Sequence, residues 1–137
     1  MRLLIDTNIL LEVILEQEKA EEARNLLRRT NQHTFFITDY CLHSIGLLLF
    51  RRKRPSIFWQ FVSDMILNAG VIVTYLPPED MQSVIETAQA FHLDFDDAYH
   101  YAVADKQDLA IVSFDADFDR TQRGRTTPAG VIAASSQ

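Results

Sequence analysis

Short apolar runs alternate with amphipathic helical patterns along the whole chain, and this alternation limits the possible folds more than any other sequence feature. Strand–helix alternation requires crossover connections, which produce a mainly parallel sheet with helices on both faces. We therefore predict an α/β protein with three α/β/α layers and a central sheet of four to five strands. The expected strands are residues 3–5, 34–38, 71–75 and 110–113.

Apolar residues at helical spacing fill the segments between these strands. Asp39 is expected to cap the helix after the second strand, and a further helix is expected to begin at or near Asp96. Ile85 and Trp59 belong to helices whose apolar residues are expected to face the core. The stretch 45–50 is apolar on every side of its helix, so it lies either in deep core or partly against a partner.

The length of 137 residues predicts a single domain, 1–137, in which only residues 135–137 resemble a tail. Cys41 is the one cysteine, so an internal disulfide is impossible. No uninterrupted apolar stretch is long enough to span a bilayer, and the first apolar run is too short for a signal peptide. We expect a cytoplasmic protein that does not use a membrane.

The formal net charge of −6 argues weakly against nucleic-acid binding, because phosphates repel an acidic surface. Acids gathered around a metal ion would inflate that charge without making the whole surface negative. The basic residues are also clustered. One cluster is a candidate contact for an RNA backbone, although a solvated loop would explain it equally well. It consists of Arg51, Arg52, Lys53 and Arg54.

Acidic residues follow the first and last predicted strands. Asp6 comes directly after the first strand, and Asp115 and Asp117 come directly after the last. Asp96 and Asp97 lie at a helix start shortly before the last strand. Each acid alone could be a helix cap or a turn residue. The carboxyl ends of parallel strands meet at one edge of a sheet, so their joint placement predicts a common site.

Several carboxylates close together are costly without a neutralising partner. At about 4 Å, two like charges repel by roughly 4 kcal/mol at an effective dielectric of 20. A divalent cation converts this repulsion into binding, and an all-oxygen ligand set suits Mg²⁺ or Mn²⁺. Such ions support hydrolysis of phosphodiesters.

Three motifs give the chain a resemblance to a known family. They are Leu-Ile-Asp-Thr-Asn at 4–8, His-Leu-Asp-Phe-Asp-Asp-Ala at 92–98 and Ser-Phe-Asp-Ala-Asp-Phe at 113–118. Thr-Pro at 127–128, followed by an apolar stretch, adds to the set. In order, spacing and total length the chain resembles the PIN domain, most closely the small VapC-type toxins of bacterial toxin–antitoxin pairs.

The resemblance implies an endoribonuclease that depends on Mg²⁺ or Mn²⁺ and acts as the toxin of a toxin–antitoxin pair. It also implies a homodimer and an antitoxin partner that occupies the cleft. Asp6, Asp97 and Asp115 match the core acids of the family, both as catalytic residues and as metal ligands. The positions that match supporting residues are Asn8, Asp96, Ser113 and Asp117.

The chain departs from the family in the helix after the second strand, where a Glu is usual. Ser44 falls at that position, and its hydroxyl could reach a metal only through water. His43 beside it could bind a phosphate or transfer a proton if it faces the cleft, or it could be an ordinary helix residue. The missing acid supports an alternative function, a catalytically impaired PIN-like domain that binds RNA or protein.

Two other function classes fit less well. A phosphotransferase with Asp6 as the nucleophile would require a second Asp two residues later in the sequence, where the chain has Asn8. A nucleotide-binding Rossmann domain would require a glycine-rich loop after the first strand. The chain has four glycines in all, and Asp-Thr-Asn occupies that place.

Overall fold

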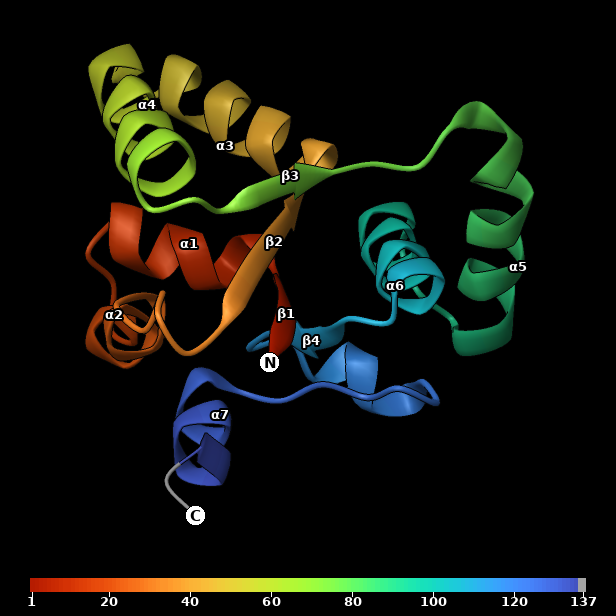
Figure 1. Cartoon of the computed structure of the whole chain (residues 1–137). Helices are drawn as coiled ribbons and strands as arrows, with labels where there is room; N and C mark the ends of the chain where they lie inside the picture. The colour runs from red at the N-terminus through yellow and green to blue at the C-terminus, as the bar shows by residue number, and fades with distance from the viewer. Residues whose placement is uncertain (136–137) are drawn as a thin grey trace.

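The computed structural model describes residues 1–135, in which helices cover both faces of a parallel sheet (Figure 1). The four strands have the order β3-β2-β1-β4, and every pair is parallel. This arrangement confirms the predicted three-layer α/β/α class. The strands are β1 (Arg2–Ile5), β2 (Thr34–Thr38), β3 (Ile72–Thr74) and β4 (Ala110–Val112).

The β1 strand has neighbours on both edges and side chains on both faces. Leu4 lies opposite Phe36 of β2 and Ile111 of β4. Leu3 and Ile5 point into the core on one face, and Leu4 points into the core on the other. This alternation follows from the period of two in a strand, and it explains why β1 is apolar throughout.

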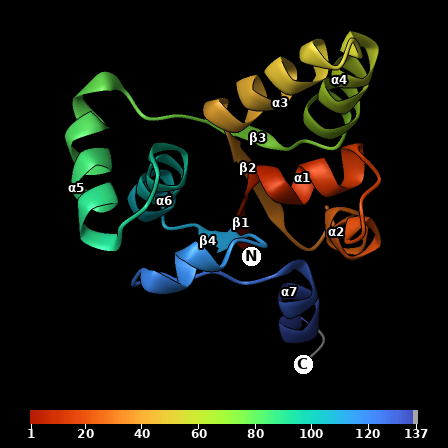
Figure 2. The ribbon, with the colours of Figure 1, turned by 180° about the vertical axis from the view of Figure 1, so that it is seen from behind.

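The helices divide between the two faces. Figures 1 and 2 show α5 and α6 together on one side of the sheet and α1 to α4 on the other. The first side contains α5 (Met81–Phe91), α6 (Phe95–Gln107) and the 3₁₀ helices η2 (Pro78–Asp80) and η3 (Ala116–Arg120). The second contains α1 (Thr7–Ile14), α2 (Ala20–Leu27), α3 (Asp39–Arg51), α4 (Pro55–Phe61), the π-helical η1 (Val62–Asn68) and α7 (Pro128–Ser135).

The cap of α3 differs from the prediction. Thr38 is the N-cap, and its Oγ1 accepts a hydrogen bond of 2.9 Å from the Cys41 N–H. Asp39 is the first helical residue instead, where its charge still favours the positive helix end. α6 begins at Phe95, one residue before the predicted position, with Asp94 as its N-cap.

The predictions that Ile85 and Trp59 face the core are wrong. Ile85 is 56% exposed and Trp59 is 62% exposed. α5 packs mainly on α6, so it buries only a narrow stripe around Val84. α4 turns Phe58 and Phe61 toward the core, and the helical turn then directs Trp59 outward.

The apolar stretch 45–50 of α3 is partly core and partly surface. Ile45 and Leu49 are fully buried, whereas Leu47 is 54% and Phe50 is 61% exposed. Gly46 lets α4 approach closely, since a Cβ there would lie 3.0 Å from the Phe58 ring. Within residues 1–135, helices are all too short or too polar to cross a membrane. The expected tail falls partly outside the described residues, at 136 and 137.

Candidate metal site

A small cavity of about 220 Å³ opens at the carboxyl end of β1. The chain segments around it are the start of α1, the first turns of α3 and α6, and the loop after β4. Four of the nine lining residues are aspartates, so the topology gathers acids from three distant parts of the sequence. The lining residues are Asp6, Thr7, Asn8, Leu11, Tyr40, Ser44, Asp96, Asp97 and Asp115.

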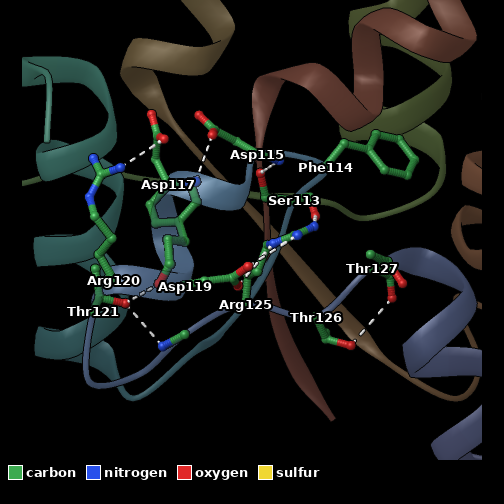
Figure 3. Close-up of polar contacts among 12 residues, drawn as sticks. Ser113, Phe114, Asp115, Asp117, Asp119, Arg120, Thr121, Arg125, Thr126 and Thr127 are labelled. Carbon is green, nitrogen blue, oxygen red and sulfur yellow. Dashed lines mark hydrogen bonds and ion pairs between the residues drawn. The ribbon is translucent and has the colours of Figure 1, made fainter.

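Three carboxylates come within ligand distance of a single ion. Asp97, Asp115 and Asp117 each offer one oxygen, and these oxygens all lie within 4.8 Å of one another. Asp115 caps η3, and its Oδ1 accepts a 2.8 Å hydrogen bond from the Asp117 N–H. Because of this turn, the two side chains lie next to each other, as Figure 3 shows.

The carboxyl of Asp97 has a strongly raised pKa. It lies in the first turn of α6 and is only 8% exposed. Burial, reinforced by the nearby charges of Asp96, Asp6 and Asp115, raises the pKa of its carboxyl to about 7. A cation among these acids would relieve both the burial and the repulsion. The carboxylate set therefore fits a hard divalent ion such as Mg²⁺ or Mn²⁺.

Asp6 lines the same cavity but is tied to protein groups. Its Oδ1 accepts a 2.8 Å bond from the Thr7 N–H, and its Oδ2 accepts a 2.6 Å bond from the Ser113 hydroxyl. Burial alone would raise its pKa, but contacts with His100, Ser113 and Thr7 outweigh that effect and hold the pKa below its usual value. Asp6 is thus a fixed negative charge, and it lies outside the close set of Asp97, Asp115 and Asp117.

Asn8 and Ser113 join α1 to the loop after β4. The Asn8 side chain donates to Ser113 Oγ at 3.3 Å and accepts from the Phe114 N–H at 3.2 Å. Ser113 Oγ also accepts from the Asp115 N–H at 2.9 Å. One serine hydroxyl therefore contacts both Asp6 and Asp115. These contacts are consistent with the supporting role predicted for Asn8 and Ser113.

Ser44, the position predicted to match the family's Glu, and its neighbour His43 differ in their access to the acids. Ser44 lines the acid cavity and also a second cavity beside it. His43 lines this second cavity, of about 340 Å³, to which Asp6, Asp97 and Asp115 do not contribute. The structure thus places Ser44, but not His43, beside the acids.

His100 is a buried neighbour of Asp6 that the sequence patterns do not indicate. It is 3% exposed, with Nδ1 3.3 Å from Asp6 Oδ1 and Nε2 2.9 Å from Thr38 Oγ1. The Nδ1 contact has an ion-pair distance without hydrogen-bond geometry. The sequence feature that could have indicated His100 is its spacing from Asp97, because residues three apart on a helix share a face.

The predicted basic cluster is not beside the acids. Residues 51–54 are exposed at the far end of α3, and Arg52 and Arg54 line a separate cavity. At 1.5 Å per residue, the helix separates Tyr40 from Arg51 by roughly 16 Å. The arginine that reaches the acids is Arg120, which donates to Asp117 Oδ1 at 3.0 Å (Figure 3).

The fold and site together define an α/β protein with a carboxylate cluster at the ends of parallel strands. The PIN domain family model matches residues 3–124, so the chain belongs to the PIN domain family. This confirms the resemblance drawn from the three motifs. No curated protein sequence matches the chain closely enough to count as a relative.

Solved structures with a similar fold include known toxins and their complexes. VapBC2 from Rickettsia felis, bound to a DNA fragment from its promoter, has a TM-score of 0.74 at 14% identity, covering 92% of this chain and 97% of that one. VapC20 of Mycobacterium tuberculosis, a Sarcin-Ricin loop cleaving toxin, has a TM-score of 0.71 at 19% identity, covering 85% and 92%. FitAcB from Neisseria gonorrhoeae has a TM-score of 0.69 at 19% identity, covering 94% and 99%.

Proposed function

We propose that this protein is a metal-dependent endoribonuclease and the toxin of a toxin–antitoxin pair. The observation that carries the proposal is the close set of Asp97, Asp115 and Asp117, whose oxygens lie within 4.8 Å of one another. The raised pKa of Asp97 supports it, because the protein alone leaves this charge uncompensated. Perturbed acids that converge in a cavity are typical of functional sites.

Each acid has a distinct task in this proposal. Asp97, Asp115 and Asp117 would hold Mg²⁺ or Mn²⁺, and Asp6 adds a fixed negative charge on the cavity wall. A divalent cation held by these residues would supply positive charge to a scissile phosphodiester and would make a water molecule more acidic. Arg120, which pairs with Asp117, balances part of the charge in the metal-free protein.

The catalytically impaired alternative has its own support in Ser44. A neutral hydroxyl at this point of the cavity leaves the site one carboxylate short of the usual family set. If the remaining acids bind no metal at millimolar concentration, the protein is a PIN-like domain that binds RNA or another protein. Metal binding therefore separates the two functions.

RNA, an antitoxin and a second copy of the chain are the partners in this proposal. The fold neighbours include a toxin–antitoxin complex from Klebsiella pneumoniae, at 20% identity and a TM-score of 0.69. The basic residues 51–54 would contact an RNA backbone only some distance from the acids, so they would add affinity without orienting the cleaved bond.

The nuclease proposal is tested by cleavage of end-labelled single-stranded RNA with Mn²⁺ or Mg²⁺. We expect wild-type protein to cut internally, and EDTA or Asp115→Asn to lower the rate by on the order of 100-fold or more. Asp64→Asn, a matched change at an exposed acid of η1, should leave the rate unchanged. Equal cleavage by wild type and Asp115→Asn would overturn the proposal.

The toxin proposal is tested in growing bacteria. Induced expression of the wild type should arrest growth, and Asp115→Asn expressed at the same level should not. Unchecked growth of the host, with abundant wild-type protein that cleaves RNA in vitro, would separate the nuclease from the toxin role and count against the latter.

A further inference from the structure

We propose that the second cavity, beside the acids, binds one unpaired nucleobase of the RNA strand. This inference rests on the proposed nuclease function and adds a base-recognition site to it. The cavity has a volume of about 340 Å³, which lies in the range of small-molecule sites. Its lining residues are Asp39, Tyr40, His43, Ser44, Leu47, Phe95 and Tyr99.

The two cavities lie next to each other. Tyr40 and Ser44, on the first turns of α3, line both of them. Phe95 lies two residues before Asp97 at the start of α6, so the same helix end also serves both cavities. An RNA phosphate held at the acids would therefore bring an adjoining base close to the second cavity.

Aromatic rings form the walls of the second cavity. The ring centroids of Tyr40, Phe95 and Tyr99 lie 6.1–6.3 Å from one another. Tyr99 is buried, whereas Phe95 is 55% and Tyr40 is 39% exposed, so ring surface faces solvent at the opening. Proteins recognise single-stranded RNA by stacking unpaired bases on such exposed rings.

Polar groups at the edge of the cavity favour a base over a phosphate or an apolar peptide. Asp39 Oδ1 accepts from the Tyr99 hydroxyl and from the Tyr40 N–H, each at 2.8 Å. Within the described residues, Asp39 Oδ2 accepts no hydrogen bond. Because Asp39 lines the cavity, its carboxylate repels a phosphate, and an apolar side chain bound there would offer Oδ2 no hydrogen-bond partner. The amino or imino N–H groups of a base would satisfy it.

Fluorescence of 2-aminopurine, which stacking quenches, tests the site directly. The probe is a short single-stranded RNA that carries one 2-aminopurine, titrated with protein in Ca²⁺, which neutralises the acids, and the quench is read before any RNA is cut. We expect quenching by the wild type, and roughly 10-fold weaker binding with loss of the quench for Phe95→Ala. Ile85→Ala is the matched control: its side chain is 56% exposed on α5 and lines neither cavity.

Cleavage of the same RNA in Mn²⁺ separates this proposal from the nuclease proposal. Quenching that depends on Phe95, without cleavage by any protein, would support the base site and overturn the nuclease. Cleavage with equal KM for wild type and Phe95→Ala, and no quenching, would overturn the base site alone. The base site would also be overturned if Phe95→Ala binds and cleaves RNA like the wild type but binds an amphipathic helical peptide more weakly. That result would assign the cavity to a protein partner.

Discussion

At the scale of single residues, Asp97 shows how a functional group opposes stability. Its carboxyl is buried among the charges of Asp96, Asp6 and Asp115, and together these raise its pKa to about 7. In the unfolded chain the same carboxyl would ionise near its ordinary value, about 3.9. Above that pH the unfolded state therefore holds fewer protons than the folded state, and folding loses free energy until the pH passes about 7.

Asp97→Asn should consequently stabilise the metal-free protein at pH 8, by roughly 1–3 kcal/mol. The advantage should shrink below pH 7 and vanish near pH 4, where both side chains are neutral. Thermal unfolding in EDTA at pH 4, 6 and 8 measures this difference, with Asp64→Asn as the control. A variant less stable than the wild type at pH 8 would show that Asp97 contributes favourable contacts instead of repulsion.

A substitution at Ser44 adds a charge instead of removing one, because Ser44 lines the acid cavity at the position predicted to match the family's Glu. Ser44→Glu adds a carboxylate beside Asp97, so it should tighten Mn²⁺ binding about 10-fold and lower the melting temperature of the metal-free protein. Calorimetric titration with Mn²⁺ measures the affinity, and Ser44→Gln controls for side-chain size. Equal affinity for all three proteins would mean that position 44 does not reach the ion.

The acids of the site could be predicted, but their exact partners could not. Asp6 and Asp115 follow from the rule that the carboxyl ends of parallel strands meet at one edge, and Asp97 follows from the family motif at 92–98. The sequence does not show which oxygens lie closest together: Asp6 lines the same cavity, and Asp117 joins Asp97 and Asp115 in the close set. His100 escaped prediction because its contact with Asp6 depends on the packing of α6 against β1 and β2.

At the scale of elements, α3 is joined to the site and to the core through its N-cap residue. Thr38 is fully buried, caps α3 by accepting from the Cys41 N–H, and contacts His100 Nε2 at 2.9 Å. Thr38→Val keeps the shape but removes both contacts, so it should cost about 1–3 kcal/mol of unfolding free energy. Urea denaturation measures this loss.

The control for this prediction is Thr34→Val, at the exposed start of the same strand, which should be nearly neutral. If Thr38→Val costs no more than Thr34→Val, the cap does not stabilise α3. If Thr38→Val retains full Mn²⁺ affinity despite its lower stability, the Thr38–His100–Asp6 contacts are structural and do not position Asp6.

The strands were easier to predict than the helices. β1 to β4 all lie within or one residue beyond the apolar runs that predicted them, because strands buried on both faces must be apolar throughout. The patterns do not predict α1, which begins directly at the acid after β1, or α7, whose apolar residues lack a polar face. The prediction that Ile85 faces the core was wrong, because periodicity indicates which residues share a helix face but not how much of that face other elements cover.

At the scale of the whole molecule, exposed apolar side chains on α3 and α4 support a dimer. Phe50 and Trp59 are 61% and 62% exposed, and Phe50 packs edge-on against Phe58 at 6.4 Å between ring centroids. Apolar surface of this kind is typical of protein–protein contacts. We expect light scattering after gel filtration to give twice the mass of the chain, and the double variant Phe50→Ser, Trp59→Ser to give the monomer mass. A monomeric wild type at high concentration would contradict this prediction.

The most direct test of the central claim is calorimetric titration of the metal-free protein with Mn²⁺, followed by an RNA-cleavage assay on the same samples. The account predicts that the wild type and Asp64→Asn bind Mn²⁺ and then cleave RNA, and that Asp97→Asn does neither. If the wild type binds no Mn²⁺ at millimolar concentration, the acids are not a metal site, and the protein is a PIN domain retained for binding a partner.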